Sequence, residues 1–140
     1  MHRHLYTPLD LPANPLSVGV AREHVRETLA NWSLPQPCVA AAVQIVSELV
    51  TNGVQHGVAQ GTVSLDLDLN GGILTVTVTN EVERDQKALT VRADTIDDDA
   101  EGGRGLLLVA AYAHNWDHDR PRPDRVSVWA TIKQAEEPTR

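Results

Sequence analysis

Two segments of the sequence carry side chains whose types and spacing suit phosphate chemistry. In the first, Glu48-Leu49-Val50-Thr51-Asn52, the acid and the amide are four residues apart. Residues at that spacing lie on one face of a helix. There a carboxylate can act as a general base, and an amide oxygen can ligate Mg²⁺, which prefers oxygen ligands. A solvated helix face is the alternative interpretation of this pair.

The second segment is Gly103-Arg104-Gly105, which precedes an apolar run over residues 106–111. Glycine lets the backbone approach a phosphate, and the N-terminus of a helix offers free N–H groups and a partial positive charge. A simple turn before a helix is the alternative interpretation. Neither segment is specific by itself.

The elements that must position these side chains follow from apolar periodicity. Apolar residues at helical spacing predict a helix over residues 15–31, started by Asn14-Pro15, and a second helix over residues 37–56. Two alternating runs on either side of Asn70-Gly71 predict a β-hairpin, because both turn residues tolerate positive φ. The other expected elements are an edge strand, a buried helix and a last strand, over residues 2–9, 106–111 and 126–132.

Length and composition restrict the class of protein. A chain of 140 residues is expected to form a single domain over 1–140, and the family resemblance described below places its core over about 12–132. A net charge of −7 argues against broad nucleic-acid binding, which needs Lys and Arg to displace counterions. The single cysteine, Cys38, excludes an intramolecular disulfide and is expected to be a passive apolar residue.

The location of the protein is expected to be cytoplasmic, away from membranes. No signal peptide is visible at the N-terminus. The longest nearly apolar stretch, residues 106–113, is far shorter than the about 20 residues of a membrane-spanning helix.

In their order, with the hairpin between them, the two phosphate segments resemble motifs of the GHKL, histidine-kinase-like ATPases. Residues 48–57 resemble the N box and residues 103–109 the G2 box. His114-Asn115-Trp116 and residues 126–130 also resemble the single-domain branch of anti-sigma-factor serine kinases. The resemblance implies a Bergerat fold, an α+β two-layer sandwich whose mixed, mostly antiparallel sheet is covered by helices on one face.

The resemblance also implies a role for each matching residue. Glu48 would be the catalytic base that activates the acceptor hydroxyl, and Asn52 would bind the Mg²⁺ that bridges the phosphates of ATP. His56 would lie near the phosphates, Asn80 would contact adenine, and residues 94–103 would form a lid. The backbone around the phosphates would come from Gly103, Arg104, Gly105 and Leu106.

The sequence departs from the family pattern at the residues that bind adenine. The family has an aspartate at the end of the second hairpin strand and then a glycine-containing box, whereas this chain has Asn80 and then Glu81-Val82-Glu83. An asparagine accepts and donates hydrogen bonds but lacks the charge that strengthens a carboxylate's bond. Gln55 stands where relatives often have arginine, and five carboxylates lie within residues 94–101.

Two functions therefore remain open. The first is an Mg-ATP-dependent protein serine kinase and anti-sigma factor, which controls transcription by switching between a sigma factor and an antagonist protein. The second is a nucleotide-poor, non-catalytic module of the same fold that sequesters a sigma factor or another regulator. A water-activating ATPase is a third hypothesis. The resemblance further suggests a homodimer. The charge and the short apolar runs predict contact with neither nucleic acid nor membrane.

Two smaller features have simple structural interpretations. His114, Asp117, His118 and Asp119 are expected in a solvated turn after a helix rather than in a metal site. Trp116 and Trp129 are expected to pack in the core.

Overall fold

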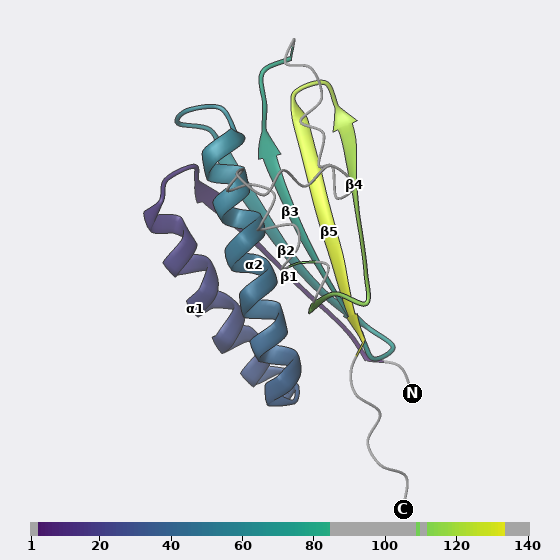
Figure 1. Ribbon diagram of the computed structural model, residues 1–140. Coiled ribbons are helices and arrows are strands. Elements are labelled where there is room, and N and C mark those ends of the chain that lie inside the picture. Colours follow the sequence, from purple (N-terminus) through teal and green to yellow (C-terminus); the bar gives the residue numbers. More distant parts are fainter. Residues whose placement is uncertain (1–2, 85–108, 110–111, 134–140) are drawn as a thin grey trace, which may run out of the picture.

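The computed structural model describes residues 3–84, 109 and 112–133, which form two layers. Two helices, α1 and α2, cover one face of a five-stranded sheet (Figure 1). This arrangement confirms the predicted α+β two-layer sandwich. The elements in chain order are β1 (His4–Pro12), α1 (Leu16–Asn31), α2 (Gln36–His56), β2 (Thr62–Asn70), β3 (Ile73–Glu81), β4 (Asn115–Arg122) and β5 (Arg125–Lys133).

The sheet has the strand order β1-β2-β3-β5-β4, and the four pairings between the described strands are all antiparallel. The predicted edge strand is β1, although it ends at Pro12 rather than at residue 9. The opposite edge is β4, where the sequence had predicted a solvated turn. That prediction was wrong because β4 is mostly exposed on both faces, so it lacks the apolar alternation that marks a half-buried strand.

The hairpin of β2 and β3 is confirmed, with its turn one residue later than expected. Asn70 still pairs with Ile73, and the turn residues are Gly71 and Gly72, with φ of 58° and 81°. Glycine adopts positive φ at no steric cost, so two successive glycines displace Asn70 from the turn.

Both helices begin where the sequence predicted, within one residue. The Leu16 N–H donates a hydrogen bond of 2.8 Å to Oδ1 of Asn14, and Pro37 lies in the first turn of α2. Among the described helices, only α2 is long and apolar enough to cross a bilayer, a property that the search for continuous apolar runs missed. Its apolar side chains pack inside the protein, which is typical of a core helix.

The core lies between the helices and the sheet and is built from aliphatic side chains. The largest fully buried ones include Leu29, Ile45, Leu65, Leu67 and Leu74. Trp116 packs against this core, as predicted. Trp129 does not, because it pairs with Thr77 and thus lies on the outer face of the sheet, while Val76 and Val78 point inward.

Candidate functional site

One flank of α2 carries the predicted polar stripe. Glu48 and Asn52 are half-buried and His56 is exposed. On the neighbouring flank, Ser47 Oγ accepts hydrogen bonds from Nε and Nη2 of Arg22 on α1, at 3.1 and 2.6 Å. Successive helix residues are about 100° apart, so Glu48 continues the rotation past Ser47 and faces away from α1. The stripe therefore lies on the flank that α1 leaves uncovered.

The last turn of α2 is tied to the end of β3. The Gly57 N–H closes the helix by donating to the Gly53 carbonyl at 3.0 Å. The next N–H, of Val58, donates to the carbonyl of Glu81 at 2.8 Å. These bonds bring Asn80, the residue before Glu81, next to the end of the helix that carries the stripe.

Asn80 is a buried polar residue in an otherwise apolar row. It continues the inward-facing series of Leu74, Val76 and Val78 on β3. Only 7% of its surface is exposed, and its Nδ2 atom is fully buried with no hydrogen-bond partner in the described part of the chain. An unpaired buried amide costs about 1–3 kcal/mol, so an acceptor from a ligand would stabilise the protein.

Gly53 in α2 and Gly57, the residue after the helix, pack closely beside this amide. A Cβ at Gly57 would lie 3.3 Å from Asn80 Nδ2, and one at Gly53 would lie 3.5 Å from Asn80 Cβ. The sequence interpretation treated Gly57 only as a helix stop and did not single out Gly53. Their spacing, one helical turn apart at the end of the stripe, is the signal that could have identified both.

The neighbouring carboxylate, Glu81, is held by structural partners. Its Oε1 accepts a hydrogen bond from the Thr62 N–H at 3.1 Å, and its Oε2 lies 3.7 Å from Nη1 of Arg125. Glu81 therefore connects strands at this end of the sheet. Beside it, Nδ2 of Asn80 is buried and has no hydrogen-bond partner among the described residues.

Several predicted site residues lie outside the described ranges. These are Gly103, Arg104, Gly105 and Leu106, together with the expected lid over residues 94–103. Of the helix expected over 106–111, Val109 is described as helical and fully buried, and its carbonyl accepts a hydrogen bond from Ala113 at 2.8 Å.

Residues considered for metal or thiol chemistry lie on β4 and in the first turn of α2. His118 lies on strand β4, and the described residues contain no group of three or more side chains that could hold a metal ion. Cys38 is buried, and burial raises the pKa of its thiol, as befits a passive apolar residue.

A family model for the histidine kinase-like ATPase domain matches residues 11–132. This chain belongs to the histidine kinase-like ATPase domain family. The matched range includes α2, the hairpin and β5, so the family assignment covers every described element except most of β1. The comparison with curated proteins found no match.

The fold is also similar to that of a solved structure. The crystal structure of the RsbU and RsbW domains of Rv1364c from Mycobacterium tuberculosis aligns with a TM-score of 0.70 and 19% sequence identity. The alignment covers 93% of this chain and 32% of the other, so this chain spans about a third of that length. At this identity the similarity establishes the fold alone.

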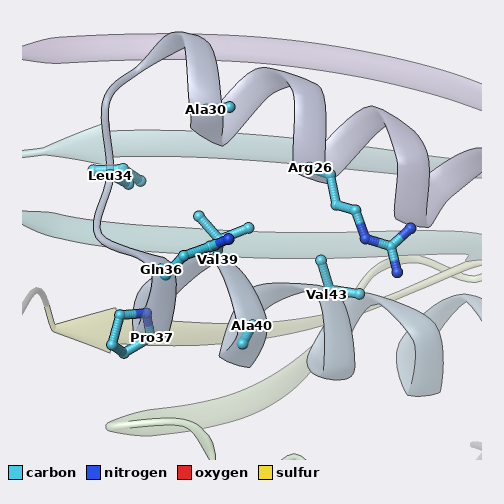
Figure 2. Close-up of a pocket in the computed structure, with 8 residues that line it drawn as sticks. All are labelled: Arg26, Ala30, Leu34, Gln36, Pro37, Val39, Ala40 and Val43. Atoms are coloured by element: carbon cyan, nitrogen blue, oxygen red, sulfur yellow. The ribbon is translucent and has the colours of Figure 1, made fainter.

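A separate open cleft of about 880 Å³ lies between α1 and α2 (Figure 2). Arg26 and Ala30 of α1 line one side, and Pro37, Ala40 and Val43 of α2 line the other. These α2 residues belong to the first half of the helix, whereas Asn80 contacts its last turn. The cleft is therefore distinct from the candidate nucleotide site.

Proposed function

We propose that this protein binds Mg-ATP and phosphorylates a serine of an antagonist protein, and that it acts as an anti-sigma factor. The observation that carries the proposal is the unpaired, buried Asn80 amide at the end of the helix that presents Glu48 and Asn52. Family membership supports ATP as the ligand. The likeness to a structure with an RsbW domain supports the choice of partners.

Each residue of the site has a defined part in this proposal. Asn80 contacts the adenine ring, Asn52 supplies an oxygen ligand to Mg²⁺, and His56 lies toward the phosphates. Glu48 accepts the proton of the serine hydroxyl as it attacks. The serine oxygen bonds to the γ-phosphorus of ATP as ADP leaves, and Mg²⁺ held by Asn52 would neutralise charge on the phosphate oxygens. The backbone of residues 103–106 is proposed to complete the phosphate site.

Nucleotide binding tests the first half of the proposal. Calorimetry should detect binding of Mg-ATP to the wild type, and Asn52→Ala should abolish the Mg²⁺-dependent part of the affinity. Asn70→Ala, which changes an exposed residue at the far end of the hairpin, is the matched control and should bind like the wild type. Equal loss in both variants would contradict the assignment of Asn52.

Phosphate transfer tests the second half. With Mg-ATP and the cognate antagonist, the wild type should yield phosphoserine. Glu48→Gln keeps the side-chain size but removes the base, so it should bind Mg-ATP and lose transfer by about 10²–10⁴-fold. Glu27→Gln, on the exposed surface of α1, is the control and should remain active. Absence of phosphoserine from the wild type with a verified partner would refute the kinase.

A second candidate function is favoured by the uncharged Asn80. A neutral amide binds a base less strongly than a carboxylate, by about half on the usual comparison of charged with neutral pairs. In this alternative the protein is a nucleotide-poor, non-catalytic module that sequesters a sigma factor or another regulator. No heat from millimolar Mg-ATP, with the partner still bound, would favour it over the kinase.

The assembly and location belong to the same proposal. A single cytoplasmic domain over residues 1–140 forms a homodimer and contacts the sigma factor and its antagonist, but neither nucleic acid nor membrane. Light scattering of the purified protein measures the oligomeric state directly. A mass of one chain at all concentrations would contradict the dimer.

A further inference from the structure

The residue proposed to contact the nucleotide base is Asn80. Its side-chain amide carries both a hydrogen-bond donor and an acceptor. We propose that Asn80 makes the site bind 6-oxopurine nucleotides, of the hypoxanthine type, about as tightly as adenine nucleotides. The inference rests on the proposed nucleotide site and concerns which bases that site accepts.

The surroundings of Asn80 isolate its amide from other polar partners. In the sheet register its neighbours are Val63 on β2 and Val126 on β5, which are both buried and apolar. Gly57, the residue after α2, packs so closely against the amide that a Cβ there would lie 3.3 Å from Nδ2. The amide is 7% exposed, and within the described residues nothing bonds its nitrogen. At this end of β3, Nδ2 of Asn80 is therefore the buried side-chain donor that the described residues leave for a ligand acceptor.

The amide matches the edges of both kinds of purine. Adenine presents an acceptor at ring nitrogen N1 and a donor at its 6-amino group, whereas hypoxanthine presents a donor at N1 and an acceptor at O6. An asparagine side chain has a donor and an acceptor, and turning the amide over exchanges them. It can therefore pair with either base, whereas an ionised carboxylate has acceptors only and is repelled by O6.

Within the described residues, the charged group next to Asn80 on β3 does not restore selectivity at this position. The nearest carboxylate along β3 belongs to Glu81, and it is engaged with the Thr62 N–H and with Arg125. Asn80 thus determines the selection between the 6-amino and the 6-oxo group.

The test compares two nucleotides that differ only at this edge. The full chain is titrated with Mg-ATP and with Mg-inosine triphosphate, which lacks the 2-amino group of guanine and so avoids a second difference. The wild type should bind both with dissociation constants within about threefold. Asn80→Asp should raise the preference for ATP by about tenfold or more, because the carboxylate rejects O6. Asn70→Asp makes the same chemical change at the exposed last residue of β2 and should leave the ratio unchanged.

Each outcome has a distinct meaning. A wild type that prefers ATP by more than about tenfold overturns the inference and leaves the nucleotide site standing. An unchanged ratio in a folded Asn80→Asp variant overturns it as well. If that variant does not fold, as circular dichroism would show, the wild-type ratio alone decides. If neither nucleotide binds, the proposed nucleotide-dependent function fails together with the inference.

Discussion

Two buried side-chain nitrogens lack a hydrogen-bond partner in the described structure, and they occur in different settings. Asn80 Nδ2 lies against Gly57 at the end of α2, beside the polar stripe of the proposed site. His24 Nε2 belongs to α1, which packs beside α2. An uncharged ring tolerates burial better than a charged one, so His24 is a stability feature rather than a site residue.

Titration of His24 should make the protein less stable in acid. Burial lowers the pKa of its ring below 6.5, and the nearby Glu27 carboxylate opposes the shift. As the pH falls, the unfolded chain therefore binds a proton at His24 before the folded chain does. The free energy of unfolding is not reduced by this proton above pH 6.5 and decreases as the pH drops below 6.5. His24→Gln should reduce the difference between the free energies of unfolding in urea measured on the two sides of pH 6.5. His118→Gln, which is exposed on β4, is the control and should keep the wild-type difference.

At the scale of elements, α2 performs two tasks at once. One face of the helix builds the core with residues such as Ile45 and Val50, and the neighbouring flank presents Glu48 and Asn52. Its last turn is held against β3 through Val58 and Glu81. The position of the stripe relative to Asn80 therefore depends on how the helix ends.

Substitution of Gly57 should disturb that end. A Cβ at this position would lie 2.5 Å from the Gly53 carbonyl oxygen and 3.1 Å from that of Glu81, and neither backbone atom can move freely. Gly57→Ala should lower the free energy of unfolding by about 1–3 kcal/mol and weaken Mg-ATP binding. Urea denaturation and calorimetry measure the two effects.

The matched control is Gly19→Ala on α1, where a Cβ would meet nothing within 4 Å. Alanine is a better helix former than glycine, so this variant should gain about 0.5–1 kcal/mol and bind nucleotide normally. A similar loss of stability in both variants would show that crowding at Gly57 is not the cause.

At the scale of the whole molecule, one continuous core joins the helices to the sheet. It includes residues from α1, α2 and the sheet strands as far as Trp116 at the β4 edge. A core shared in this way favours cooperative unfolding of a single domain. The family match over residues 11–132 is consistent with this unity.

Unfolding in urea should therefore show one transition. Ile45 is fully buried, so Ile45→Ala should lower the free energy of unfolding by about 2–5 kcal/mol. Circular dichroism follows the helices, and tryptophan fluorescence reports on Trp32 at the end of α1 and on Trp116 and Trp129 in the sheet. The two signals should shift to the same lower midpoint, whereas separate midpoints would contradict a single cooperative domain.

The sequence by itself determined the elements whose signals are local. Apolar periodicity located both helices, and alternation with a glycine turn located the hairpin, because each pattern reflects burial of one face of one element. The stripe of Glu48 and Asn52 was predictable for the same reason, since helix geometry alone sets their common face. The family resemblance rested on these local motifs and was confirmed.

Only the tertiary structure decided the features that depend on pairing between distant segments. Strand β4 exists because β5 supplies its hydrogen-bond partners, and its exposed faces left no apolar pattern to detect. Trp129 is excluded from the core by its register with Thr77. The burial of Asn80 beside Gly57 follows from the bond between Val58 and Glu81, residues far apart along the chain. Local propensity cannot encode such contacts, because they exist only when helix and sheet have packed together.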